Sequence, residues 1–262
     1  MDESITKLTL NGSALGDGAT IYFNSGSSFT ITTFNLTGMN SNNLIILRPT
    51  TGVAWTLKNT GSAGVSFVDV QLSNAGPGNT IYATNSIDSG SNVNWKIGQF
   101  TWTGAVDNNW SNASNWDSTV VPGPGDAPLI PSAAPRMPTL TQSVTISTLT
   151  IMAGSSLTLS GFNLTLSSFT NYGTFVLLGS EAVSSAPSNL AGSTVTYNGG
   201  GVVTSTWTYA NLAINNMNGT FQATGALSVS ENLTLTTGTF NANNKDIAVG
   251  GAWQNTSGMS LN

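Results

Sequence analysis

Apolar positions recur along the C-terminal part of the chain at steps of six or seven residues. One apolar residue from each strand-like run gives the series Ile214, Phe221, Leu227, Leu233, Phe240, Ile247 and Trp253. Three steps make roughly 20 residues, as from Ile214 to Leu233, from Leu227 to Ile247 and from Leu233 to Trp253. A repeat of about 20 residues built from three short strands is typical of a solenoid, in which each coil has three faces.

An earlier stretch repeats in the same way. Its series is Val144, Ile151, Leu157, Leu164, Phe169 and Phe175, which would pair Val144 with Leu164, Ile151 with Phe169 and Leu157 with Phe175. Within runs such as "SLTLSGFNLTL", apolar and polar residues alternate, so one side chain points inward and the next outward. We therefore expect a core of aliphatic and aromatic residues beneath an outer surface of Thr and Ser.

Polar residues fall between the strand-like runs, where the coils would turn. Gly and Asn tolerate the left-handed backbone conformations that corners require. Asn side chains can also stack on Asn in the next coil and hydrogen-bond along the axis. The expected corner residues are Asn163, Asn218, Gly219, Asn232, Gly238, Asn243 and Asn244.

An antiparallel sandwich or barrel also has many short strands, but it favours turns every 8–12 residues, and six to seven is too tight. The N-terminal part is looser. Leu8 and Phe29 are about one such repeat apart, as are Phe23 and Leu44, and the spacing then lengthens. We interpret this part as a second set of coils with larger loops, ending near Gly98.

Two stretches resemble elements of large bacterial surface proteins. One is "VSFVDVQLSNAGPGNTIYATNSIDSGSNVNWKIG". The other runs from Trp102 through Trp110 and Asn115–Trp116 to the Pro122–Asp126 turn and a following aliphatic strand. The chain thus resembles adhesin-like, right-handed parallel β-helix proteins with repeats like those of filamentous haemagglutinin or autotransporter passengers. The resemblance implies the fold and an extracellular location, and general crossover chirality agrees with the handedness.

Composition excludes several classes of function. Only 6% of residues are charged, the net charge is −5, and Cys and His are absent. Disulfides and the usual zinc sites are therefore excluded. Six basic residues cannot form a nucleic-acid footprint, and no apolar run approaches the length of a membrane span. The first residues do not form a signal peptide, so we expect a mature form or a segment of a longer secreted chain.

Four of the seven tryptophans lie between Trp95 and Trp116, just before a run rich in Pro and Gly. Indole rings can offer a platform for a sugar, which makes Trp95, Trp102, Trp110 and Trp116 candidate binding residues. They can equally close the end of one stack of coils, because Trp buries a large area and its N–H finds a partner at a wet edge. The position of the cluster favours the second interpretation.

Other chemistry is sparse. Asp88 and Asn92 suggest a weak calcium site, although calcium prefers six to eight oxygens and an Asx-turn explains the pair equally simply. His is absent and Lys and Arg are few, so the carboxylates lack the basic partners that the acid–base set of a polysaccharide lyase or hydrolase needs. We expect neither an enzyme nor a bound cofactor.

The sequence therefore predicts an all-β protein with three parts: a β-solenoid segment at 1–98, a Trp- and Pro-rich junction or cap at 99–138, and a second β-solenoid segment at 139–262. The expected function is structural and adhesive, at a cell surface or outside the cell. The final coil has no polar cap, which suggests either further chain or end-to-end association with another copy. A carbohydrate-binding module centred on the four tryptophans is the alternative, with a surface glycan as its partner.

Overall fold

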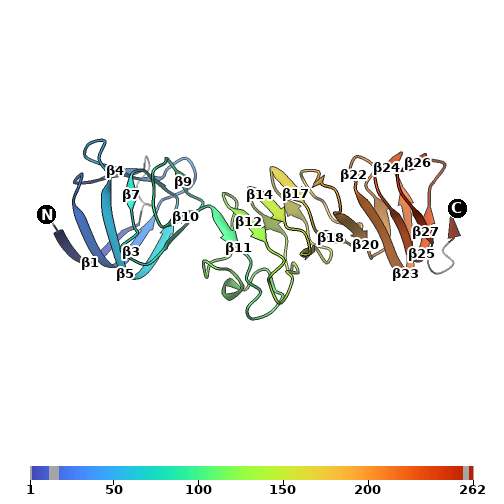
Figure 1. Ribbon diagram of the computed structural model, residues 1–262, viewed down its shortest axis with the longest axis horizontal. Coiled ribbons are helices and arrows are strands. Elements are labelled where there is room, and N and C mark those ends of the chain that lie inside the picture. The colour runs from blue at the N-terminus through green and yellow to red at the C-terminus, as the bar shows by residue number, and fades with distance from the viewer. Residues whose placement is uncertain (1, 12–17, 256–259, 262) are drawn as a thin grey trace. The chain divides into compact units, whose positions relative to one another are not determined.

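The computed structural model describes residues 2–11, 18–255 and 260–261. This part of the chain is all-β, as expected, and its strands form parallel sheets; its one helical segment is the short 3-10 helix η2 (Ala113–Asn115). The chain divides into two compact units (Figure 1). Unit 1 comprises Met1–Gln99 and Pro122–Asp126, and unit 2 comprises Phe100–Val121 and Ala127–Asn262. The predicted junction at 99–138 thus contributes residues to both units.

Unit 1 contains two sheets (Figure 1). The larger has the order β1 (Asp2–Asn11), β3 (Ser28–Thr37), β5 (Trp55–Ser66), β8 (Ile81–Thr84) and β10 (Trp95–Ile97), with β7 (Ser73–Asn74) also paired to β5. The smaller has the order β2 (Ala19–Phe23), β4 (Ile45–Pro49), β6 (Val68–Val70) and β9 (Ile87–Asp88). Inward residues of both sheets form one core, in which the rings of Phe23 and Trp55 stack with their centroids 3.7 Å apart.

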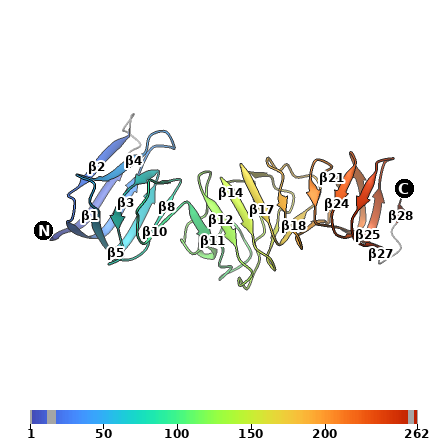
Figure 2. The ribbon, with the colours of Figure 1, turned by 45° about the horizontal axis from the view of Figure 1, so that its top comes forward.

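Unit 2 contains four sheets (Figure 2). The first comprises β11 (Gln99–Thr101, of which Phe100 and Thr101 belong to this unit), β12 (Ala127–Ile130), β14 (Thr148–Ile151), β17 (Ser168–Asn171) and β19 (Ser188–Asn189). A second comprises β15 (Ser156–Thr158), β18 (Thr174–Leu177), β20 (Thr194–Tyr197), β23 (Asn211–Ala223), β25 (Leu233–Asn241) and β27 (Trp253–Asn255), with β21 (Gly201–Val203) on β23 and β28 (Ser260–Leu261) on β25. The others pair β13 (Val144–Thr145) with β16 (Leu164–Thr165), and β22 (Thr208–Tyr209) with β24 (Leu227–Val229) and β26 (Ile247–Val249).

Strands of unit 2 pair with strands about one repeat later in the sequence. Val144 pairs with Leu164, Leu227 with Ile247 and Leu233 with Trp253, each as the apolar series predicts. Inward residues consequently stack from strand to strand. One such ladder is buried throughout and consists of Leu157, Phe175, Val195, Leu212 and Leu233.

Two predicted offsets in unit 2 are wrong by two residues. Ile151 pairs with Asn171 and not with Phe169, and Ile214 pairs with Leu235 and not with Leu233. A slip of two residues leaves the inward and outward faces unchanged, because side chains alternate with a period of two. Periodicity alone therefore cannot distinguish the two registers.

The predicted register of unit 1 is wrong. Leu8 pairs with Phe34 and Phe23 with Pro49, several positions further along the chain than the apolar spacing predicts. From β5 onward the offset shortens instead of lengthening, and Trp55 pairs with Ser73. The physical reason lies in β3, whose alternation of buried and exposed residues changes phase in mid-strand, so this strand of ten residues is longer than the step of six or seven residues expected between successive strands.

The expected corners are confirmed in part. Asn243 and Asn244 follow β25 and have positive φ angles of 51° and 55°. Gly238 also has a positive φ angle, of 100°, but it lies inside β25 and not at a corner. Asn163 and Asn232 act instead through their side chains, which accept hydrogen bonds from backbone amides about one repeat later in the sequence, those of Ala182 and Ala252. Residues 218–219 fall inside β23 and not at a corner, and their side chains lie outside the described part.

Amide ladders form as predicted. The Asn171 side chain donates to Oδ1 of Asn189 over 2.8 Å, and Asn232 donates to Oδ1 of Asn211 over 3.0 Å. Each ladder links strands that are neighbours in a sheet but about one repeat apart in sequence. The ladders therefore reinforce the register that the buried residues set.

Candidate functional site

The four candidate tryptophans belong to two different units. Trp95 belongs to β10 of unit 1, where its ring meets the edge of Phe34 and its Nε1 donates to Ser73 Oγ over 3.0 Å. The other three, Trp102, Trp110 and Trp116, belong to unit 2.

The three indoles of unit 2 pack edge to face. Trp116 is central, with ring centroids 5.2 Å from Trp102 and 4.7 Å from Trp110. None is more than 1% exposed. The Nε1 of Trp102 donates to the carbonyl of Arg136, and that of Trp116 to the carbonyl of Trp110. The rings therefore fill the interior and offer no open face to a sugar.

A network of Asp and Asn side chains holds the tryptophan-bearing loop. Asn115 is fully buried at the end of η2; its Oδ1 accepts from the amides of Val106 and Asp107, and its Nδ2 donates to Asp107 Oδ1. The Asp107 carboxylate also accepts from the Asn112 side chain and the Asn109 amide. These hydrogen bonds, that from Asn112 first, hold the pKa of Asp107 below its ordinary value of 3.8.

Sequence reasoning missed this network, although a local signal exists. The spacing of Asp and Asn in "DNNWSNASNW" suits side chains that accept from the amide two residues later. Asp107 does so with Asn109, and Asn109 with Ser111. The chemistry of the loop is thus a chain of Asx-turns that brings the three indoles together.

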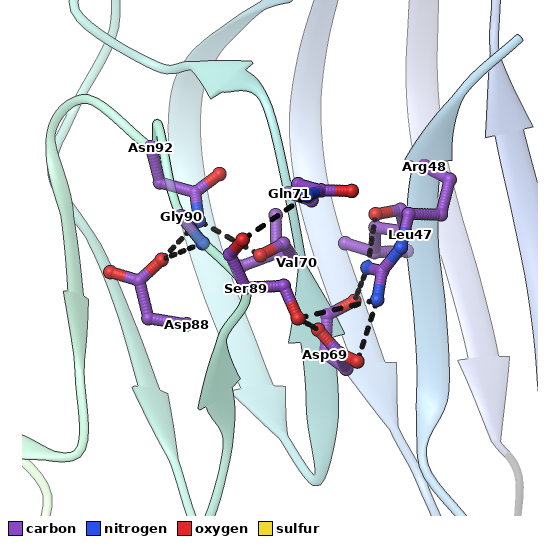
Figure 3. Close-up of polar contacts among 9 residues, drawn as sticks. All are labelled: Leu47, Arg48, Asp69, Val70, Gln71, Asp88, Ser89, Gly90 and Asn92. Atoms are coloured by element: carbon purple, nitrogen blue, oxygen red, sulfur yellow. Dashed lines mark hydrogen bonds and ion pairs between the residues drawn. The ribbon is translucent and has the colours of Figure 1, made fainter. Parts of the chain in front are cut away.

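Asp88 and Asn92 do come together, in the loop that follows β9 (Figure 3). Oδ1 of Asp88 accepts from the Gly90 amide and from the Asn92 side chain. The Asn92 oxygen accepts from the Ser73 amide, and its Nδ2 also donates to the carbonyl of Val70. Oδ1 of Asp88 and the side-chain oxygen of Asn92 are thus both engaged with N–H donors. Within residues 2–11, 18–255 and 260–261, no three acidic, His or Cys side chains gather as a metal site would require.

An ion pair lies beside this loop on the smaller sheet of unit 1 (Figure 3). The Arg48 guanidinium on β4 reaches the Asp69 carboxylate on β6 at 2.6 Å and also donates to the carbonyls of Leu47 and Asp69. Ser89 donates to the other Asp69 oxygen over 2.5 Å. The side chain of Arg48 is 22% exposed and that of Asp69 is 16% exposed. We call Arg48, Asp69 and Ser89 the clasp, because this half-buried group links neighbouring strands.

Arg48 lies on β4, Asp69 lies on β6, and Ser89 directly follows β9. The pairing of β4 with β6 and of β6 with β9 brings the three residues together. Sequence reasoning missed the group because it used the wrong offset for unit 1. The clasp satisfies both oxygens of the carboxylate and engages the guanidinium with protein groups. Its geometry suits the fixing of strand register.

The Pro- and Gly-rich run places a carboxylate in the interior of unit 1. Asp126 is fully buried; Oδ1 accepts from the Asn85 amide over 2.8 Å and Oδ2 from the Gly123 amide over 2.8 Å. Burial raises the pKa of Asp126 above 3.8, and the two hydrogen bonds oppose that shift. The Asn85 side chain in turn accepts from the Gly125 amide, so the 122–126 turn is fixed to the end of β8.

No family model matches the chain, no curated protein matches it, and no solved structure matches it. Among the residues that the structure describes, no helix is long and apolar enough to cross a membrane.

Proposed function

We propose that this chain is a structural, adhesin-like segment of a cell-surface or secreted protein, built as a right-handed parallel β-solenoid. One observation carries the proposal: strands of unit 2 pair in parallel with strands one repeat later, and inward residues from Leu157 to Leu233 stack in a buried ladder. Each repeat of such a fold buries its core only against its neighbours, which gives an elongated and regular support.

The polar groups support the same proposal. The described carboxylates with several hydrogen bonds act as acceptors for N–H or O–H groups of the protein. Glu181, for example, accepts from the amides of Gly161, Leu178 and Gly179. Side chains used in this way stabilise turns and strand register, as a structural segment requires.

Electron microscopy of the purified protein and of its native source tests this proposal. We expect thin elongated particles or filaments, located at the cell surface or in the medium. Compact particles, or a protein confined to the cell interior, would contradict it.

We further propose that copies associate end to end. Trp253 on β27 takes the same position in the inward ladder as the buried Leu212 and Leu233, yet it is 41% exposed. A large apolar side chain exposed at an inward ladder position offers a surface for further packing, and we assign that role to a second copy.

Sedimentation velocity over a concentration series tests the association. We expect the wild-type chain to form longer species as concentration rises, and Trp253→Ser to suppress them. Tyr22→Ser, which changes an aromatic residue that is 66% exposed in unit 1, is the matched control and should behave as wild type. A wild-type chain that stays monomeric at every concentration would refute the association.

A further inference from the structure

Three large apolar side chains lie in one exposed row on unit 2. Met152, Tyr172 and Leu190 are 41%, 40% and 38% exposed. Each stands one residue beyond the last inward residue of its strand, and the sheet's hydrogen bonds continue through them. The amide of Tyr172 donates to the carbonyl of Ile151, and the amide of Leu190 donates to that of Asn171. The row is therefore a regular feature of the sheet.

The row borders the outer face of β14, β17 and β19, which are neighbours in the first sheet of unit 2. Because adjacent strands lie about 4.8 Å apart, the three side chains span about 10 Å across the strands. Two residues earlier on each strand, Thr150, Thr170 and Ser188 pair in register and form a parallel column of hydroxyls. None of these outward positions carries a charge.

Backbone packing fixes the spacing of the row. A Cβ atom on Gly173 would lie 2.4 Å from the carbonyl oxygens of both Met152 and Ser155, so only glycine allows the two turns to approach this closely. The Asn171 side chain accepts from the Gly173 amide and donates to Asn189, which ties the turn after Tyr172 to the next strand. A ligand would thus meet side chains already held in position.

We propose that this row binds a strand of neutral polysaccharide, lying across the sheet strands. The aromatic face of Tyr172, flanked by Met152 and Leu190, packs against the apolar faces of the sugar rings. The hydroxyls of Thr150 and Thr170 hydrogen-bond to sugar hydroxyls. An uncharged surface of this kind suits an uncharged ligand, whereas a stable protein partner requires about 800 Å² on each side, far more than three part-exposed side chains supply. The site adds a ligand to the structural role and does not depend on it.

Affinity electrophoresis tests the proposal, with laminarin, hydroxyethyl cellulose or galactomannan in the gel and polygalacturonate as the acidic counterpart. We expect at least one neutral polysaccharide to retard the wild-type chain, and Tyr172→Ala to weaken that binding roughly tenfold. Tyr22→Ala removes an exposed tyrosine from unit 1 and should bind as wild type. Thermal unfolding of each variant verifies that it is folded.

Several results would overturn the inference: no retardation by any of the three neutral polysaccharides, equal retardation of Tyr172→Ala and wild type, or retardation by polygalacturonate alone. Self-association that depends on Tyr172, without polysaccharide binding, would also overturn it and would assign the row to a second copy. The structural role is tested separately by the particle shape in electron microscopy, and the end-to-end association by sedimentation of Trp253→Ser, so neither result depends on polysaccharide binding.

Discussion

At the scale of single residues, buried polar groups decide much of the behaviour of this protein. Tyr197 and Tyr209 are each 1% exposed, and their hydroxyl oxygens lie 3.1 Å apart. Tyr209 donates to the carbonyl of Thr204, whose amide donates to Tyr197. Burial is the largest cause that raises the pKa of both phenols, so both stay neutral under ordinary conditions.

Removal of one hydroxyl from this group leaves buried partners unsatisfied. We expect Tyr209→Phe to lower the free energy of unfolding by about 1 to 2 kcal/mol. Urea denaturation measures the change. Tyr22→Phe removes an exposed hydroxyl and should alter the value by less than about 0.5 kcal/mol. Equal effects of the two substitutions would contradict the assignment.

Asp107 and Asp126 respond to pH in opposite directions. The pKa of Asp107 is lowered, so its contribution to stability is present above about pH 3.8 and is lost as pH falls through the folded value. The pKa of Asp126 is raised, so its contribution is present below about pH 3.8 and is lost as pH rises through the folded value.

Urea denaturation between about pH 2.5 and about pH 6 separates the two aspartates. The stability advantage of wild type over Asp107→Asn should shrink with acid. The advantage over Asp126→Asn should grow with acid. The same trend for both variants would show that the hydrogen bonds of one of them are misassigned.

Single residues also show what sequence reasoning can and cannot reach. The tryptophans near residue 110 stand out by type, but their burial follows from the Asn115 and Asp107 hydrogen bonds, which composition does not reveal. The Arg48–Asp69 clasp needs the correct pairing offset before its partners can be recognised. The residues missed are therefore of two kinds: a local network at Asp107 and Asn115, and a group at Arg48 and Asp69 that depends on long-range pairing.

At the scale of elements, the spacing of inward residues was enough to predict parallel pairing in unit 2. Leu227 with Ile247 follows directly from the apolar series. The pairing of Ile151 with Asn171 does not follow from it, because the buried polar residue Asn171 takes the place expected for Phe169 on the same face of the strand. In unit 1 the long strand β3 hides the repeat, since its alternation of buried and exposed residues changes phase within the strand and its pairing with β5 shifts register at that point.

Close contact between turns gives a prediction at this scale. Gly173→Ala would place a methyl group against the carbonyl oxygens of Met152 and Ser155, both of them backbone atoms. We expect a loss of about 1 to 3 kcal/mol in the free energy of unfolding, as for overpacking elsewhere. Gly52→Ala, where a Cβ meets nothing within 4 Å, is the control. Chemical denaturation that finds the two equal would show that the turns separate freely.

At the scale of the whole molecule, low charge is the dominant property. Six basic and eleven acidic residues are present in 262, and Arg48–Asp69 is the ion pair of the described part. Screening acts on charges, so stability that comes from buried ladders and amide hydrogen bonds should be nearly independent of salt. We expect the thermal midpoint to stay within about 2 °C between about 0.05 M and about 0.5 M NaCl. A larger shift would indicate that long-range electrostatics contribute to stability.

The pairing offset of unit 2 also limits how a chain of this kind can change in length. Val144 pairs with Leu164 and Leu227 with Ile247, and the interval between partners is the same in both pairs. Val195 pairs with Leu212 and Leu212 with Leu233 across intervals that differ from this one and from each other, so the turns absorb differences in length while the paired strands keep the same residues inward. Recombination within the turns can therefore add or remove whole strands. Variation of that kind would leave the ladder of buried residues intact while it altered the reach of the protein.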